Sequence, residues 1–203
     1  MSDKKHWDAI YEARQPGQVS WFQAHAALSL QFIRDTGVAV DAHILDVGAG
    51  ASVLVDDLLN AGYRKLSVLD ISSAALRAAQ ARLGSASSRV KWIEADVTRL
   101  ELPDASVDVW HDRAVFHFLT DPLDRQRYVQ TVLRVVKPGG HVIIATFAED
   151  GPLKCSGLDI VRYSPATLQR ELGSAFEFVN SAKELHRTPS GAEQSFVYCY
   201  FRR

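Results

Sequence analysis

Cysteine is scarce in this 203-residue chain, which contains only Cys155 and Cys199. Two cysteines so far apart exclude a disulfide framework and a zinc site built on cysteine pairs. Cys199 alternates with aromatic residues in a strand-like run, which predicts a small buried side chain. Cys155 lies among glycine, proline and serine residues, which predicts a passive loop cysteine. We therefore expect both thiols to be reduced, and we expect no metal site.

The chain also lacks an excess of charge and a long apolar run. Lysine and arginine total 23 against 24 acidic residues, for a formal net charge of -1, so we expect no nucleic-acid partner. No apolar stretch approaches the length that crosses a bilayer, and residues 1–6 are followed by polar sequence rather than a signal-peptide core. These absences predict a cytoplasmic protein without a membrane partner.

What the chain does contain is a regular alternation of strand-like and helical segments. Hydrophobic residues make up 47% and charged residues 23% of the sequence, which is typical of a globular domain. The alternation predicts a parallel sheet with right-handed crossovers between its strands. The predicted strands end near Asp46, Asp70, Asp96, His111 and Thr146.

Capping residues mark the ends of the predicted helices. These helices cover 53–59 after Ser52, extend from Ser72 or Ser73 to Gly84, from Asp121-Pro122 to Lys137, and from Ser164-Pro165 to Gly173. A turn is expected at 138–140. Residues 176–185 and 193–201 have no helix between them, so they predict a hairpin that adds an antiparallel strand to the sheet.

The most informative stretch is Ile44–Ser52, an apolar run that leads into a glycine-rich turn. Gly48, with Ala49 and Gly50, lets the chain turn sharply after a strand and lets a ligand approach the backbone amides. Asp70 follows about twenty residues later at the end of the next strand, which is the spacing of a carboxylate that accepts hydrogen bonds from a ribose diol. Together these features predict a nucleotide-like ligand.

The residues around this loop favour a nucleoside with an amino-acid tail over a dinucleotide. Asp46 is unfavourable beside a phosphate and favourable beside an ammonium group. Val53 occupies the position where the dinucleotide fingerprint has glycine or alanine, so we expect NAD to bind poorly. Asp96 ends the third strand, where a carboxylate could accept a hydrogen bond from an adenine amine. A helix-capping role is the alternative interpretation of Asp46 and Asp70.

In this order, the motifs resemble the class I S-adenosylmethionine-dependent methyltransferases over nearly the whole chain. The matching segments are 44–52 for the first motif, Asp70 for the ribose-binding acid, Asp96-Val97 for the adenine-contacting pair, 107–113 for the fourth strand, and 133–144 for the helix, turn and fifth strand. Ser52 departs from the pattern, since many members have a third glycine there. The resemblance implies S-adenosylmethionine as the cofactor. It also implies a Rossmann-like α/β fold, with a seven-stranded, mostly parallel sheet, helices on both faces and a C-terminal antiparallel hairpin.

We expect a single methyltransferase domain over 1–203, with an N-terminal helical cover over 1–36 and a Rossmann-like core over 42–203. The aromatic residues before Gln23 precede a sheet that is complete without them, so this segment is predicted to form a lid over the reactive methyl group. Packing of a helix onto the core is the alternative. The predicted cofactor-binding residues are Trp7, Tyr11, Trp21, Asp46, Gly48, Ala49, Gly50, Asp70, Ile71, Asp96, Val97 and Asp112.

The residues after the fourth and fifth strands are expected to lie near the methyl acceptor. Asp112 and His117 are candidate catalytic bases by location, while methyl transfer depends chiefly on alignment and the exclusion of water. Asp112 could instead orient the cofactor's methionine end or pair with Arg113. His186 is predicted to face solvent.

The favoured function is methyl transfer to a small-molecule acceptor by in-line displacement. A protein-lysine methyltransferase and a noncatalytic S-adenosylmethionine-binding module are the alternatives, and a protein substrate is therefore kept open. The sequence does not choose among oxygen, nitrogen and sulfur acceptors, and it does not indicate an oligomeric state.

Overall fold

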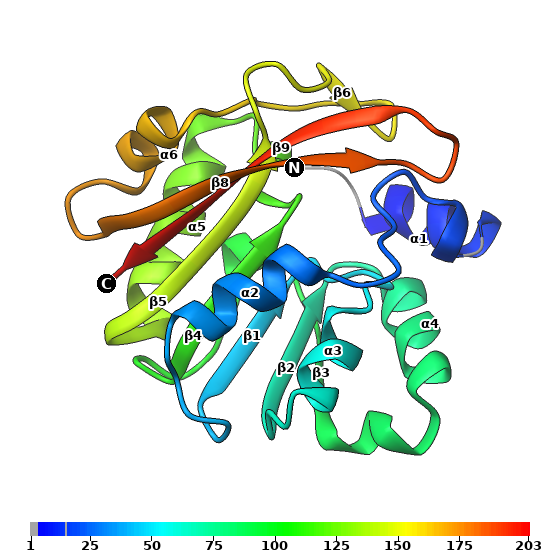
Figure 1. The fold of residues 1–203 in the computed structure, drawn as a ribbon, viewed down its shortest axis with the longest axis horizontal. Helices are drawn as coiled ribbons and strands as arrows, with labels where there is room; N and C mark the ends of the chain where they lie inside the picture. The colour runs from blue at the N-terminus through cyan, green and yellow to red at the C-terminus, as the bar shows by residue number, and fades with distance from the viewer. Residues whose placement is uncertain (1–3, 15) are drawn as a thin grey trace.

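The computed structural model describes residues 4–14 and 16–203 and is built around one large sheet (Figure 1). Seven strands follow the order β3-β2-β1-β4-β5-β9-β8. The first five of these are mutually parallel, whereas β9 is antiparallel to both β5 and β8. The strands are β1 His43–Val47, β2 Lys65–Asp70, β3 Val90–Glu94, β4 Val107–Arg113, β5 Val136–Phe147, β8 Glu177–Arg187 and β9 Glu193–Arg202. The predicted fold class, including the C-terminal hairpin, is confirmed.

Helices cover both faces of the sheet. They are α1 Lys4–Ala13, α2 Ala27–Asp35, α3 Leu54–Asn60, α4 Ser73–Leu83, α5 Pro122–Val135 and α6 Pro165–Leu172. Buried side chains of α5 and α6 pack on one face, and those of α2, α3 and α4 pack on the other. The core therefore has two apolar layers, one on each side of the sheet. Within the described residues, none of the helices is long and apolar enough to cross a membrane.

The predicted helix caps are largely confirmed. Ser72 is the N-cap of α4, its hydroxyl accepting a hydrogen bond from the Ala75 amide at 3.2 Å, and the helix ends at Gly84. Ser164 caps α6 in a reciprocal pair with Thr167. Ser52 is one residue too early to be the N-cap of α3, which is Val53, although its hydroxyl accepts a hydrogen bond from the Leu54 amide at 3.1 Å.

Two predicted boundaries between α5 and β5 were wrong. Helix α5 ends at Val135 rather than Lys137, and the expected turn at 138–140 belongs to an irregular start of β5. Pairing with the residue after β9 explains this difference, because the Gly139 amide donates to the Arg203 carbonyl and the Arg203 amide donates to the Gly140 carbonyl. These hydrogen bonds extend the sheet through the glycines.

The segment after β5 contains a small hairpin of its own. Strands β6 Lys154–Cys155 and β7 Leu158–Asp159 pair antiparallel, and the intervening Ser156 and Gly157 both have positive φ angles, of 51° and 78°. This places Cys155 in a strand rather than the predicted loop. The hairpin lies beyond the carboxyl end of β5, where it helps to enclose the site described below.

Candidate functional site

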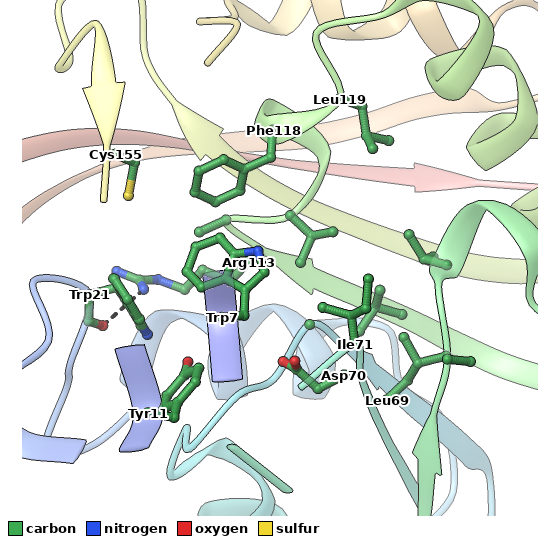
Figure 2. Close-up of a pocket in the computed structure, with 16 residues that line it drawn as sticks. Trp7, Tyr11, Trp21, Leu69, Asp70, Ile71, Arg113, Phe118, Leu119 and Cys155 are labelled. Carbon is green, nitrogen blue, oxygen red and sulfur yellow. Dashed lines mark hydrogen bonds between the residues drawn. The ribbon is translucent and has the colours of Figure 1, made fainter. Parts of the chain in front are cut away.

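A cavity lies at the carboxyl ends of β1, β2 and β4, beneath helix α1 (Figure 2). We call it the first cavity. Its walls are mainly apolar, and its only carboxylate among the described residues is that of Asp70. The lining residues are Trp7, Tyr11, Trp21, Val47, Gly48, Leu69, Asp70, Ile71, Ala95, Val97, Arg113, Ala114, Val115, Phe118, Leu119 and Cys155.

Asp70 connects the glycine-rich turn to the start of α4. One carboxylate oxygen accepts a hydrogen bond from the Gly50 amide and the other from the Ser72 amide, each at 2.7 Å. The residue is 6% exposed, and this burial raises the pKa of its carboxyl group to about 6. Asp70 therefore lies at the end of β2 in the cavity wall, as the sequence predicted.

Two positions of the glycine-rich turn, Gly48 and Gly50, leave no room for a side chain. Gly48 and Gly50 have φ angles of 59° and 55°, in the left-handed region that favours glycine. A Cβ atom on Gly48 would strike the Val115 side chain, and one on Gly50 would strike the Tyr11 hydroxyl. The turn is therefore fitted between α1 and the segment that follows β4.

Aromatic rings from the N-terminal segment form one wall of the first cavity. Trp7 makes edge-to-face contacts with Trp21 and Phe118, with ring centroids 5.8 and 5.1 Å apart. Tyr11 lies beside Trp21 at 6.1 Å, and burial raises the pKa of its phenol above its ordinary value. Tyr11 therefore presents a neutral hydroxyl rather than a phenolate.

Helix α1 is attached to the N-terminus of α4 by Asp8. Its carboxylate accepts hydrogen bonds from the Ser72 hydroxyl at 2.7 Å and the Ala74 amide at 3.2 Å. Lys4 donates to the second carboxylate oxygen at 2.8 Å and lowers the pKa of Asp8 to about 2. Because Ser72 also donates to Asp70 through its amide, the attachment lies next to the acid of the first cavity.

Residues 19–23 are anchored differently, through β4 and the C-terminal hairpin. Arg113 donates to the Trp21 carbonyl at 3.2 Å and to Glu184 at 3.3 Å, and Glu184 accepts a further hydrogen bond from Gln23 at 2.9 Å. Val19 is 2% exposed. This part of the predicted lid is therefore packed into the core, which leaves α1 as the candidate movable cover.

One expectation about the polar residues here was wrong, and one of the alternatives for Asp112 does not hold. His186 is 5% exposed rather than solvent-facing, and its Nε2 atom lies 2.7 Å from the Ser20 carbonyl. Arg113 pairs with Glu184 rather than with Asp112. In both cases a partner distant in the sequence satisfies the side chain, and the sequence gives no signal for that partner.

A second cavity lies on the far side of Trp21 and Arg113, which line both cavities. Asp46 and His111 face each other in its wall, with the Asp46 Oδ1 and His111 Nδ1 atoms 2.7 Å apart. The remaining atoms of this pair, Asp46 Oδ2 and His111 Nε2, are buried without a hydrogen-bond partner among the described residues. Buried polar atoms are normally satisfied, so this pair is suited to a polar ligand. Its other lining residues include Gln23, Ser29, Gly48, Ala49, Ser52 and Leu54.

Four predicted site residues line neither cavity, namely Gly50, Asp96, Asp112 and His117. Gly50 is next to the first cavity, where its amide donates to Asp70. Asp112 is 0% exposed and accepts hydrogen bonds from the Val115 amide at 2.9 Å and the Tyr128 hydroxyl at 2.6 Å. His117 is also 0% exposed and accepts from the Phe147 amide at 3.2 Å. Asp96 caps the turn over 97–99, accepting from the Thr98 amide and hydroxyl.

Burial also accounts for the shifted proton affinities of the two candidate bases. It raises the pKa of Asp112 to about 6 and lowers the pKa of His117 to about 3. His117 is therefore neutral near pH 7, and Asp112 is held by its hydrogen bonds to Val115 and Tyr128. Both side chains lie in the core and line neither cavity. This arrangement does not favour direct proton removal from an acceptor by either side chain.

Several lining residues of the first cavity were missed as site residues. Phe118 and Leu119 follow β4, and Cys155 comes from β6. Their position after the fourth and fifth predicted strands indicated only that these segments lie near the acceptor, and for Cys155 the segment was 147–163. Burial raises the pKa of the Cys155 thiol to about 11, so it presents a neutral sulfur. In the part of the chain that the structure describes, no group of three His, Cys, Asp or Glu side chains could hold a metal ion.

Comparison with known proteins finds similarity to methyltransferases. A family model described as a methyltransferase domain matches residues 44–140. The eEF1A lysine and N-terminal methyltransferase of Mus musculus is 27% identical over 203 residues, covering 97% of this chain and 28% of that protein. The corresponding Bos taurus protein is covered over 22% of its length. The chain thus spans about a quarter of the length of these curated relatives.

Solved structures share the fold. A structure described as the conversion of a disulfide bond into a thioacetal group during echinomycin biosynthesis has a TM-score of 0.78 at 17% identity, covering 98% of this chain and 92% of that one. The Burkholderia thailandensis 1,6-didemethyltoxoflavin-N1-methyltransferase, solved with S-adenosylhomocysteine, has a TM-score of 0.68 at 22% identity and covers 88% of this chain and 77% of that one.

Proposed function

We propose that this chain is a class I S-adenosylmethionine-dependent methyltransferase that binds S-adenosylmethionine across both cavities and methylates a small-molecule acceptor. The match of residues 44–140 to a methyltransferase domain and the fold shared with solved methyltransferases support this proposal. The single observation that carries this proposal is that two cavities adjoin, each with one buried carboxylate in its wall. The first cavity contains Asp70, and the second contains Asp46, whose Oδ2 atom has no partner among the described residues. The cofactor has the same division, into an adenosine and a charged amino-acid end.

In this proposal the first cavity holds the adenosine. Asp70 accepts hydrogen bonds from the ribose, and the apolar side chains of Leu69, Ile71 and Val97 contact the adenine ring. We retain Asp96 as a candidate partner for the adenine amine, next to Val97. The raised pKa of Asp70 fits this role, because a buried carboxylate gains from additional hydrogen-bond donors.

The second cavity holds the amino-acid end of the cofactor. Asp46 Oδ2 is buried and unpartnered, and a carboxylate in that state is stabilised by an ammonium group. Gly48 and Ala49 line the cavity beside it. Asp46 also disfavours the binding of NAD, because the pyrophosphate of NAD would place negative charge near this carboxylate.

When bound, the cofactor supplies an electrophilic methyl group on a sulfonium. The protein's task is to align the acceptor and exclude water. Trp7, Trp21 and Phe118 supply aromatic surface for this purpose, and such surface also stabilises a nearby positive charge. We propose that Asp112 and His117 shape the segment after β4 rather than remove a proton, because both are buried outside the cavities.

A small-molecule acceptor is favoured by the walls of the first cavity. The cavity is covered by α1 and by Cys155 of the β6–β7 hairpin, and its charged lining among the described residues is Asp70 and the Arg113 guanidinium. A lysine acceptor would benefit from additional acidic groups near the methyl donor. The relatives named as eEF1A lysine methyltransferases make a protein acceptor the second candidate.

The test is incubation of the purified chain with methyl-labelled S-adenosylmethionine and a cell extract, followed by separation of proteins from metabolites. We expect label in the metabolite fraction, and loss of that label with Asp70→Asn. A variant at the amino end of β1, His43→Asn, is the matched control, because His43 lies at the opposite edge of the sheet. Label in a protein would establish the second candidate. Cofactor binding without transfer to either fraction would indicate a noncatalytic binding module.

The remaining expectations about the whole protein also stay proposals. We treat the described residues as one catalytic domain with α1 as its cover. The cytoplasmic location and the absence of a nucleic-acid partner stay predictions from the sequence.

A further inference from the structure

We propose that His111 is a positioning residue for Asp46, and that protonation of His111 weakens binding of the cofactor's amino-acid end. The inference rests on the proposed function, because it assigns the second cavity to that end. It concerns the histidine near which the fourth predicted strand ends. The sequence leaves a candidate base and a satisfied core histidine as its two interpretations.

The hydrogen bond between the two residues determines which imidazole nitrogen carries the proton. Asp46 Oδ1 lies 2.7 Å from His111 Nδ1, and an ionised carboxylate can only accept a hydrogen bond. The hydrogen atom is therefore on Nδ1, and in the neutral ring Nε2 carries a lone pair. His111 thus orients the carboxylate through one nitrogen and offers an acceptor at the other.

Both residues are rigidly placed. Asp46 and His111 are paired across adjacent parallel strands, β1 and β4, and are 4% and 2% exposed. Their free atoms, Asp46 Oδ2 and His111 Nε2, are both acceptors and both lack a partner among the described residues. An ammonium group carries three N–H donors, so it can satisfy two acceptors that no protein donor reaches.

Few other charges face this pair. Arg113 lies on the same strand and lines the same cavity, but its guanidinium is paired with Glu184 of β8. Asp112 extends to the other side of the sheet, where it contacts Tyr128 of α5. From the remaining elements the nearby groups are neutral: Gln23 of the N-terminal segment, Ser29 of α2, Leu54 of α3, and Tyr198 of β9, which contacts Ser29.

The charge of His111 therefore has a direct effect on the second cavity. Protonation converts Nε2 from an acceptor to a donor and adds a positive charge beside the position assigned to the ammonium group. It also strengthens the attraction of His111 for Asp46, which competes with the ligand. Affinity for the amino-acid end is therefore expected to fall when His111 becomes protonated at lower pH.

The experiment compares two ligands that differ only at this end. S-adenosylhomocysteine carries the amino-acid end, and 5′-methylthioadenosine lacks it. Their dissociation constants are measured by calorimetry between pH 7.5 and 5.5 on the full chain. Asp70, whose pKa is raised to about 6, titrates in the same interval, but the proposed function assigns it to the ribose, which both ligands contain. The ratio of the two affinities therefore isolates the second cavity.

In the wild-type protein the ratio of S-adenosylhomocysteine affinity to 5′-methylthioadenosine affinity should fall at least about fivefold over this interval, since one titrating group can change it by up to tenfold per pH unit. In His111→Asn, whose amide can donate to Asp46 without titrating, the ratio should stay constant within about twofold. In His111→Leu, which cannot donate, the ratio should already be lowered about tenfold at pH 7.5.

The matched control is His43→Asn, which changes another substantially buried histidine of the sheet. His43 contacts the Ser106 carbonyl and the Ser67 hydroxyl, far from the second cavity. This variant should retain the wild-type pH dependence of the ratio. A merely structural role of His111 would lower both affinities together and leave their ratio unchanged.

The inference is overturned if His111→Asn keeps the wild-type decline of the ratio, or if the wild-type ratio does not change with pH. It is also overturned if His111→Leu lowers both affinities equally. Failure of the proposed function looks different, since neither ligand would then bind the wild-type protein at pH 7.5, or both would bind with no methyl transfer in the labelled extract.

Discussion

Arg113 donates a hydrogen bond from its guanidinium to the main-chain carbonyl of Trp21 at 3.2 Å (Figure 2). The same guanidinium contacts Tyr198 at 2.9 Å and lies 4.3 Å from the centre of the Phe196 ring. The segment around Trp21 is thereby attached to β4 and β9. Because Trp21 and Arg113 line both cavities, this contact also forms the partition between the two proposed halves of the cofactor site.

Two N-terminal deletions should distinguish the role of α1 as a cover from the role of residues 19–23 in the core. The first deletion removes residues 1–14. Helix α1 has no fully buried residue, so its loss should change the unfolding temperature by only a few degrees, while turnover falls at least about tenfold because the first cavity opens to water. Deletion of residues 1–23 should lower the unfolding temperature by more than about 10 °C, since it removes buried Val19 and the Arg113–Trp21 contact. Thermal unfolding and turnover of both truncations test this, and equal destabilisation by the two would contradict it.

Replacement of Asp70 by asparagine should weaken adenosine binding in a pH-dependent way. The loss of a charged acceptor should reduce the affinity for 5′-methylthioadenosine by about 1.5 to 3 kcal/mol at pH 7.5. Wild-type affinity should fall as the pH drops below about 6, where Asp70 becomes protonated, and the variant should show no such decline. Calorimetry at pH 7.5 and 5 measures both effects, and an unchanged affinity at pH 7.5 would exclude Asp70 from the site.

His117 should make the fold sensitive to acid. Its pKa is lowered by burial to about 3 in the folded protein, against about 6.5 in an unfolded chain. Its contribution to stability is therefore complete above pH 6.5 and is lost as the pH falls towards 3, which amounts to about 2 kcal/mol at pH 5. His117→Asn should lose less unfolding free energy than the wild type between pH 7 and 5. Urea unfolding at both pH values provides the measurement, and identical losses would refute the assignment.

Asp112→Asn tests whether this residue is a structural group or a catalytic base. Its carboxylate accepts a hydrogen bond from Tyr128, which itself accepts one from Trp110 at 2.9 Å. The substitution should lower the free energy of unfolding by about 1 to 3 kcal/mol while kcat changes by less than about threefold. Removal of a general base would instead lower kcat by about a hundredfold or more. That larger loss, with unchanged stability, would reinstate Asp112 as the base.

Local patterns were sufficient to predict the elements that position the proposed cofactor site. The strand that ends at Asp70, the glycines at 48 and 50, and the cap at Ser72 are each encoded within a few residues of sequence. Their spacing predicted that Asp70 would lie at the sheet edge. The order of helical and strand-like segments likewise predicted the hairpin over β8 and β9.

The remaining features depend on partners that are distant in the sequence. Asp112 lies near the end of the fourth predicted strand, a position that also suits a catalytic base, but Tyr128 on α5 holds it in the core. His186 appeared to belong to a surface turn, yet the Ser20 carbonyl and the Phe196 ring enclose it. Asp46 was predicted from its charge, whereas its contact with His111 becomes visible only when β1 and β4 are adjacent.

The most direct test of the account is a calorimetric comparison of wild-type protein and Asp46→Asn with S-adenosylhomocysteine, 5′-methylthioadenosine and NAD. If the two cavities divide the cofactor as proposed, the variant should bind S-adenosylhomocysteine at least about tenfold more weakly, the scale of a lost charge-assisted hydrogen bond. It should bind 5′-methylthioadenosine as the wild type does, and NAD should bind poorly to both. Equal weakening of the two nucleosides by Asp46→Asn, or wild-type affinity for NAD comparable to that for S-adenosylhomocysteine, would contradict the account.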